Sequence, residues 1–227
     1  MKFFINKEKK IILYWSAKCG CSHIKKIWWY LNNCDKNDVH DHKYNHKYLP
    51  NNIKDYTTII IIRNPYKRII SGFLDKYNKN GQFIHKWKYS SLTFSKFVDE
   101  VIKNNWKMID KHHFTQQTTE EFDNKIFLSK VVKFYDIKNI DYEYIEKLFN
   151  KKITEYIKNW KGNHTRNNVN INIKLKKYIY DLDILEYYNY KINIKYFYNE
   201  EIKKKIFNFY KNDFILFYKY GFDYKIE

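Results

Sequence analysis

Short apolar runs alternate with stretches of helical spacing along the whole chain. Apolar residues fill 11–15, a β-branched run covers 57–62, and a third run covers 130–137. Runs of this length between polar segments are typical of buried strands. The run at 57–62 continues without polar alternation, which predicts a central strand buried on both faces.

Each of these strands is followed by helical spacing. The first predicted helix ends near residue 31. The others cover about 65–77, 93–105, 141–150 and 199–220. Asn64 and Thr93 are placed to cap two of them, and Gly221 to end the last. This alternation predicts an α/β, P-loop-like fold of three layers, with a central, mainly parallel sheet flanked by helices. A single domain over residues 1–227 is expected, since no repeat or linker divides the sequence.

Composition supports a folded protein with a strong positive charge. The 227 residues include 44% hydrophobic and 20% aromatic side chains, enough for a core. The formal net charge of +18 favours anionic partners, and glycan, nucleotide and nucleic acid all remain open. Tyr, Ile, Asn and Lys dominate, which is typical of an AT-rich genome, as in some microbes and large DNA viruses. Part of the lysine excess follows from that bias.

The cysteines and the apolar runs indicate in which cellular compartment the protein acts and whether it has a membrane anchor. Three cysteines, Cys19, Cys21 and Cys34, leave one unpaired in any intramolecular disulfide scheme. Reduced thiols in a cytoplasmic protein are therefore expected. No run is long enough for a signal peptide or a membrane span, so the sequence predicts a protein without a membrane anchor.

The stretch SAKCGCS, residues 16–22, lies between the first strand and the first helix. Backbone N–H groups of such a first helical turn point at an anion, and the helix dipole favours negative charge there. Lys18 adds a mobile positive charge, Gly20 allows close backbone approach, and the Ser22 hydroxyl adds a donor. The segment predicts a phosphate-binding loop. A plain turn with a surface lysine is the alternative.

A second cationic segment begins at Arg63, at the carboxyl end of the isoleucine-rich strand. Open α/β sheets place their ligand sites at such strand ends, and a planar guanidinium suits a phosphate. Lys67, Arg68 and Ser71 follow in the next helix. Two such strand ends predict a site for a ligand with two separated anionic groups. The alternative is an arginine that only pairs with a carboxylate.

SAKCGCS followed by IIIIRNPYKRIISGF resembles the sulfotransferases that use 3′-phosphoadenosine 5′-phosphosulfate (PAPS). The likeness is closest to the carbohydrate branch (Golgi-type, family 2). Further similar segments follow in the family's order, namely LTFSKFVDEVI, HHFTQQ, VVKFYDI and IFNFYKNDFILFYKYGF. The resemblance therefore covers nearly the whole chain.

The resemblance implies a reaction and a set of site residues. A sulfuryl group would pass from PAPS to a hydroxyl acceptor on a carbohydrate, leaving 3′,5′-adenosine bisphosphate (PAP), with no metal required. Lys18 is expected to stabilise the charge of the leaving phosphate. The residues implied for the 5′-phosphosulfate are Lys18, Cys19, Gly20, Cys21 and Ser22. Those implied for the 3′-phosphate are Arg63 and Ser71. The later loop WKGNHTRNN is expected to reach the nucleotide through Lys161, His164, Thr165 or Arg166.

A general base must take the proton of the acceptor hydroxyl, and histidine is best tuned for this near neutrality. His42 and His46 are the first candidates and His113 the next. Asp136 is available to orient one of them. For the histidine-rich stretch between the two motifs, a solvated loop is the alternative.

The sequence departs from the family pattern at two points. Ala17 stands where the family usually has proline, which affects loop rigidity. Thr115 and Gln116 replace the family's Xaa-Pro before Gln117, so the role of Gln117 stays open.

Other functions fit the sequence less well. Nucleic-acid binding is disfavoured because the basic residues are spread rather than striped. A kinase-like P-loop phosphotransferase is disfavoured because Lys18 precedes Gly20, whereas a Walker loop needs Gly-Lys-Ser/Thr. A zinc site is an alternative with six candidate ligands: Cys19, Cys21, His23, Cys34, His40 and His42. It is disfavoured because Cys19 and Cys21 form a Cys-x-Cys pair, which is a poor chelate.

Overall fold

The computed structural model describes residues 1–34, 46–118, 125–160, 179–188, 190 and 192–226. The chain folds into two compact units. The first combines Met1–Arg63 with Gln117–Thr165, and the second combines Asn64–Gln116 with Arg166–Glu227. Each unit has its own apolar core. A single domain over residues 1–227 stays a prediction.

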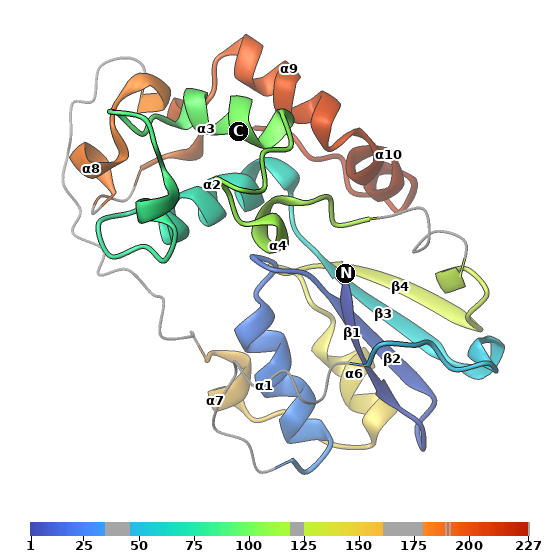
Figure 1. The fold of residues 1–227 in the computed structure, drawn as a ribbon. Helices are drawn as coiled ribbons and strands as arrows, with labels where there is room; N and C mark the ends of the chain where they lie inside the picture. Colours follow the sequence, from blue (N-terminus) through green and yellow to red (C-terminus); the bar gives the residue numbers. More distant parts are fainter. Residues whose placement is uncertain (35–45, 119–124, 161–178, 189, 191, 227) are drawn as a thin grey trace. The chain divides into compact units, whose positions relative to one another are not determined.

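A mostly parallel sheet forms the centre of the first unit. Its described strands are β1 (Lys2–Asn6), β2 (Ile11–Trp15), β3 (Thr57–Ile62) and β4 (Val131–Asp136). They lie in the order β1-β2-β3-β4, with β2, β3 and β4 parallel and β1 antiparallel to β2 (Figure 1). The three predicted strands are confirmed. Residues 59–62 of β3 are buried, as expected for a central strand.

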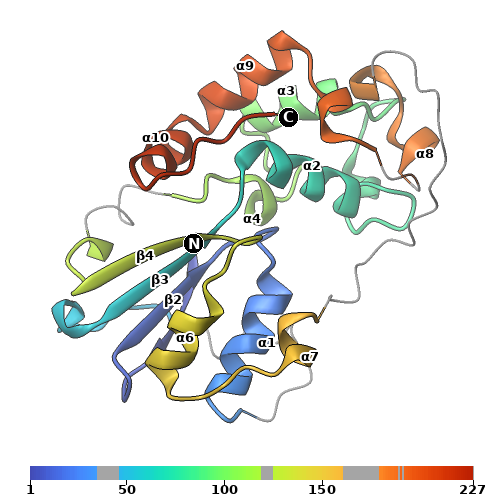
Figure 2. The same ribbon diagram turned by 180° about the vertical axis from the view of Figure 1, so that it is seen from behind.

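Helices cover one face of this sheet. They are α1 (Cys21–Leu31), α6 (Tyr142–Phe149) and the short α7 (Glu155–Lys158), which Figure 2 shows from behind. Leu13 and Ile59 of the sheet share a core with Trp28 of α1 and Phe149 of α6. The predicted fold class is confirmed, because the central sheet is mostly parallel and flanked by helices.

The sequence pattern does not predict β1. Its five residues are followed by a hairpin turn that lacks the usual Asn-Gly pair. The Asn6 side chain instead accepts the N–H of Lys9 at 2.6 Å, and Lys10 takes a left-handed φ of 55°. Because an asparagine side chain and a lysine close this hairpin, no glycine marks the turn.

The second unit is helical and has an aromatic core. Its described helices are α2 (Pro65–Lys76), α3 (Phe94–Ile102), α4 (Lys111–Phe114), α8 (Ile184–Tyr187), α9 (Glu200–Phe209) and α10 (Lys211–Lys219). Short 3₁₀ turns lie at Ile53–Asp55 in the first unit and at Ile84–Lys86, Ile179–Asp181 and Ile194–Phe197 in the second. The predicted N-caps are confirmed at Asn64 and Thr93. The C-cap of α10 is Tyr220, and Gly221 follows it with a left-handed φ of 86°.

The prediction of one long C-terminal helix is wrong, since α9 and α10 are separate helices. The Gln116 side-chain amide donates to the Phe209 carbonyl at 2.6 Å. The Tyr210 hydroxyl donates to the Phe114 carbonyl, also at 2.6 Å, and the Tyr210 side chain is buried. A side chain that takes a helical carbonyl interrupts the ladder of helical hydrogen bonds, so the helix breaks at Tyr210.

Candidate active site

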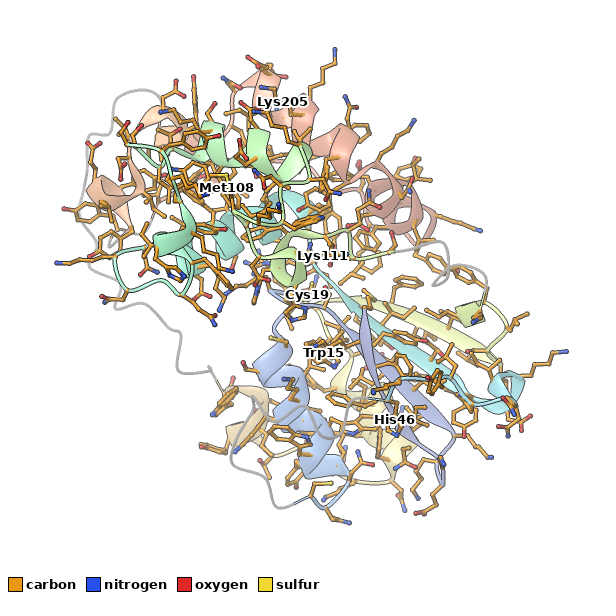
Figure 3. The ribbon with its side chains drawn as sticks, viewed as in Figure 1. Trp15, Cys19, His46, Met108, Lys111 and Lys205 are labelled. Carbon is orange, nitrogen blue, oxygen red and sulfur yellow. The ribbon has the colours of Figure 1, made fainter. Side chains whose placement is uncertain are left out.

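The carboxyl ends of the parallel strands β2, β3 and β4 meet at one edge of the sheet. Residues 16–20 connect β2 to α1, and Arg63 follows β3 directly. Ile137, which follows β4, packs against Gly20 and donates its N–H to the Ile62 carbonyl at 3.0 Å. Cys19 lies at this edge, where α1 begins (Figure 3). Open α/β sheets bind their ligands at such an edge.

The loop that connects β2 to α1 has an unusual backbone. Lys18 and Gly20 both lie in the left-handed region, with φ values of 66° and 68°. A Cβ on Gly20 would lie 2.3 Å from the Cδ1 atom of Ile137, so both the backbone angle and the available space favour glycine here. Lys18 does carry a Cβ, and its conformation costs about 1–2 kcal/mol. Strain of this kind is concentrated at functional sites.

The N-terminus of α1 opens onto this loop. Gly20 is its N-cap, and no side chain in the described part of the chain makes a cap hydrogen bond there. The first turn also contains no acidic residue. Cys21 and Ser22 lie half-buried in that turn. Because the first N–H groups of a helix have no intrahelical acceptor and lie at the positive end of its dipole, this terminus suits an anion.

Gln117 holds Arg63 and the loop together. Its Oε1 atom accepts the backbone N–H of Arg63 at 3.0 Å, and its Nε2 atom donates to the Arg63 carbonyl at 2.8 Å. The same Oε1 atom accepts the thiol of Cys19 at 2.8 Å. The sulfur of Cys19 also lies 3.0 Å from the Ser16 hydroxyl. Gln117 and Cys19 are fully buried.

Arg63 and Lys18 are joined directly. The Nη1 atom of Arg63 donates to the Lys18 carbonyl at 2.8 Å, and both side chains are half-buried. The structure therefore brings together Lys18, Cys19, Gly20 and Arg63, four of the predicted site residues. The sequence interpretation left the role of Gln117 open. The available signal was the position of Gln117 in HHFTQQ, one of the segments that resemble the family. The role of Gln117 is to fix the backbone that carries these two cations.

Replacing Gln117 with leucine is expected to lower the free energy of unfolding by about 2–4 kcal/mol. The substitution removes the amide that pairs with the N–H and carbonyl of the half-buried Arg63, and each such lost pairing costs about 1–3 kcal/mol. Cys19→Ala removes only the weaker hydrogen bonds of a thiol, to Gln117 and Ser16, and should cost less. Urea unfolding measures both, with Gln82→Leu at an exposed glutamine as the control. Equal losses for Gln117→Leu and Gln82→Leu would contradict the bridging role.

The comparison with family models decides what kind of protein this is. A model described as the sulfotransferase family matches residues 1–220. The chain belongs to the sulfotransferase family. No curated protein matches this sulfotransferase, and no solved structure matches it either. Because the match spans both units, the assignment rests on nearly the whole chain and not on the two cationic segments alone.

His23 is a neighbour of the site that the sequence interpretation considered only as a possible zinc ligand. It lies in the first turn of α1 of this sulfotransferase, where Nδ1 donates to the Trp160 carbonyl at 3.1 Å and Nε2 accepts the Tyr142 hydroxyl at 2.8 Å. Burial lowers the pKa of His23, and the hydrogen bond to Trp160 opposes this shift. His23 thus anchors the start of the loop WKGNHTRNN. The predicted nucleotide contacts of that loop lie outside the described residues: Lys161, His164, Thr165 and Arg166.

Two histidines of the stretch between the two cationic motifs, His40 and His42, lie outside the described residues. His46 lies alongside β1 (Figure 3), where its backbone N–H donates to the Phe3 carbonyl and its Nδ1 atom accepts the N–H of Ile5, both at 3.2 Å. Burial lowers the pKa of His46, with a further contribution from the charge of Lys7. One ring nitrogen of His46 therefore holds the edge of the sheet.

His113 has a different environment, on α4 of the second unit. Its Nδ1 atom contacts the carboxylate of Asp110, which is the N-cap of α4. The other carboxylate oxygen accepts the N–H of His112 at 3.0 Å. Burial would raise the pKa of Asp110, but the hydrogen bond and charge of His113, together with the His112 N–H, lower it below its usual value. Asp110, which the sequence interpretation did not name, is therefore ionised at neutral pH and orients the imidazole.

The remaining predicted residues occupy separate places. Ser71 is half-buried on α2. Asp136 is the last residue of β4, and its side chain accepts the backbone N–H of Lys138 at 2.9 Å. Arg68 is buried in the second unit, where its Nη1 atom donates to the Thr115 carbonyl at 2.6 Å. A role for Ser71 at the 3′-phosphate and a role for Asp136 in orienting a histidine stay predictions.

The three cysteines of this sulfotransferase are free thiols, with Cys19 buried and Cys21 and Cys34 half-buried. Within the described ranges, no three His, Cys, Asp or Glu side chains gather closely enough to hold a metal ion. His40 and His42 of the zinc alternative fall outside those ranges. Of the helices that the structure describes, none combines the length and the apolar character needed to cross a membrane.

Proposed function

We propose that this sulfotransferase moves a sulfuryl group from PAPS to a hydroxyl of a carbohydrate and releases PAP. The observation that carries the proposal is the hydrogen bond between Arg63 and the Lys18 carbonyl, beside the N-terminus of α1. Two cations and a helix terminus with no side-chain cap give a ligand with two phosphate groups complementary charge. ATP lacks a 3′-phosphate, so it offers no such group to Arg63.

The residues present fit the donor. Gly20 keeps the loop backbone free of a Cβ, so that the N–H groups near Cys21 and Ser22 approach the 5′-phosphosulfate. Arg63 offers a forked cation to the 3′-phosphate, with Ser71 as the second proposed contact. The thiol of Cys19 is buried against Gln117, so Cys19 would contact the 5′-phosphosulfate through its backbone and not through its side chain.

The chemistry assigned to the protein is charge stabilisation and proton transfer. As the bond between sulfur and the 5′-phosphate oxygen breaks, the leaving phosphate gains negative charge, which the Lys18 ammonium stabilises. The acceptor oxygen forms the new bond to sulfur and gives its proton to a base. We assign His113 as that base, because Asp110 orients its ring, and keep His42 and His46 as the alternatives. The free thiols favour a cytoplasmic site of action.

Thermal unfolding with PAP tests the proposed function. At a concentration of about 100 times its dissociation constant, PAP should stabilise the folded protein by about 2.7 kcal/mol, which raises Tm by roughly 5–10 °C. Arg63→Ala should lose most of this shift, and Arg63→Lys should keep part of it because the charge remains without the fork. Lys54→Ala, at an exposed lysine of the first unit, is the control.

The same experiment separates the alternatives. ATP, which lacks a 3′-phosphate, should stabilise the protein less than PAP at equal concentration. A shift with ATP as large as that with PAP would favour a phosphotransferase. A shift with a short oligonucleotide alone would favour nucleic-acid binding. Either result would contradict the proposed function.

A further inference from the structure

His23 lies in the helical turn that faces the proposed donor, yet its side chain has no part in the proposed chemistry. It is the third residue of α1, directly after Ser22, and its side chain is half-buried. Both ring nitrogens make hydrogen bonds to other segments of the first unit. The ring therefore offers no nitrogen to the donor, although the backbone of His23 belongs to the donor-binding turn.

The imidazole joins α1 to two other helical segments. Its Nδ1 atom donates to the carbonyl of Trp160, which lies just after α7, and its Nε2 atom accepts the hydroxyl of Tyr142, the first residue of α6. The rings of His23 and Tyr142 meet edge to face at an interplanar angle of 85°. These two bonds need a neutral imidazole, and burial favours that form by lowering the pKa of His23. One side chain thus connects the three helices that cover one face of the sheet (Figure 2).

The two partners of His23 are themselves held in place. The Lys26 ammonium lies 5.9 Å from the ring centroid of Trp160, and the Lys158 ammonium lies 5.8 Å from that of Tyr142. Lys158 also forms an ion pair at 3.1 Å with the buried carboxylate of Glu146, on the same helix as Tyr142. Because its partners are fixed independently, His23 ties the first turn of α1 to a rigid surface.

The first turn of α1 has few other restraints. Gly20 is its N-cap, and among the described residues no side chain makes a cap hydrogen bond there. The first N–H groups of a helix also lack intrahelical acceptors, so such a turn frays readily. A turn that must be ordered by its ligand binds that ligand more weakly than a turn that is ordered beforehand.

We propose that His23 is a positioning residue for the donor and holds the first turn of α1 in the orientation that receives the 5′-phosphosulfate. This inference rests on the proposed function, since it concerns the same donor site. His23 acts through the backbone at Cys21 and Ser22 and not on the reacting atoms. It should therefore determine the affinity for the donor and leave the rate of the chemical step unchanged.

Calorimetric binding of PAP and of adenosine 5′-monophosphate (AMP), which carries only the 5′-phosphate, tests the proposal. His23→Leu should weaken both ligands by the same factor, about threefold to tenfold, which corresponds to the loss of one to two hydrogen bonds. Arg63→Ala should weaken PAP and leave AMP unchanged, because its proposed partner is the 3′-phosphate. His85→Leu, at an exposed histidine, is the control.

Conservative variants separate the hydrogen bonds from packing of the ring. His23→Asn keeps a donor near the position of Nδ1, and His23→Gln keeps an acceptor near the position of Nε2, so each should regain part of the affinity that His23→Leu loses. Tyr142→Phe removes one hydroxyl and should weaken PAP and AMP equally. Tyr156→Phe is its matched control, because Tyr156 is 71% exposed on α7 of the same unit.

Turnover completes the test. His23→Leu should raise KM for PAPS by the factor seen in binding and keep kcat within about twofold of the original value. A lower kcat at unchanged KM, or weaker binding of PAP alone, would overturn the positioning role. Affinities of the His23→Leu and Tyr142→Phe proteins equal to those of their controls would overturn it as well. If neither PAP nor AMP binds the unmodified protein, the proposed function itself fails.

Discussion

Lys18→Ala protein is expected to bind PAP and to transfer sulfate about 10²- to 10³-fold more slowly than the unmodified protein. The Lys18 ammonium acts on charge that develops only as the bond to sulfur breaks, so its removal should lower kcat more than it weakens ground-state binding. The Lys18 carbonyl, which accepts the Arg63 guanidinium, remains after the substitution. Turnover with PAPS and thermal stabilisation by PAP measure the two effects.

The backbone angle at Lys18 supplies a control for folding. Because φ is 66°, Lys18→Gly should relieve about 1–2 kcal/mol of strain while removing the same ammonium. The glycine variant should therefore be at least as stable as the unmodified protein and yet be as slow as the alanine variant. Lys54→Ala should change neither property. Transfer above a tenth of the original rate in both Lys18 variants would rule out charge stabilisation by this side chain.

The sheet and the donor loop could be predicted because their signals are local. A run of isoleucines identifies β3, and the short turn before α1 carries a lysine and a glycine at the end of a strand. The family resemblance then linked Lys18 to Arg63 across 45 positions, and the hydrogen bond between them agrees with that link.

The features that could not be predicted depend on contacts between distant segments. Gln116 breaks the C-terminal helix through the Phe209 carbonyl, 93 positions away, so helical spacing alone gave one continuous helix. Gln117 fixes Arg63 from 54 positions away. Side chains that serve as partners of a distant backbone leave no periodicity in the sequence.

His113→Ala is expected to slow transfer by about 10²- to 10⁴-fold without changing stabilisation by PAP. The reason is that a base touches the acceptor proton and not the nucleotide. His112→Ala, at the exposed neighbouring histidine, is the matched control and should retain activity. His46→Ala should lower stability more than it lowers turnover, because the His46 side chain accepts the backbone N–H of Ile5 in β1.

Asp110→Asn tests whether orientation of His113 matters. The amide keeps the shape of the side chain but removes the carboxylate that contacts Nδ1 of His113, so transfer should slow while stabilisation by PAP is unchanged. The pKa of Asp110 is lowered in the folded protein, so its contribution to stability is present above its unfolded value near 4 and is lost as the pH falls through the folded value. Urea unfolding should therefore show the variant about 1–2 kcal/mol less stable at pH 7, with the difference shrinking toward pH 3. If His113→Ala keeps full turnover, or if only substitution of His42 abolishes it, the base is not His113.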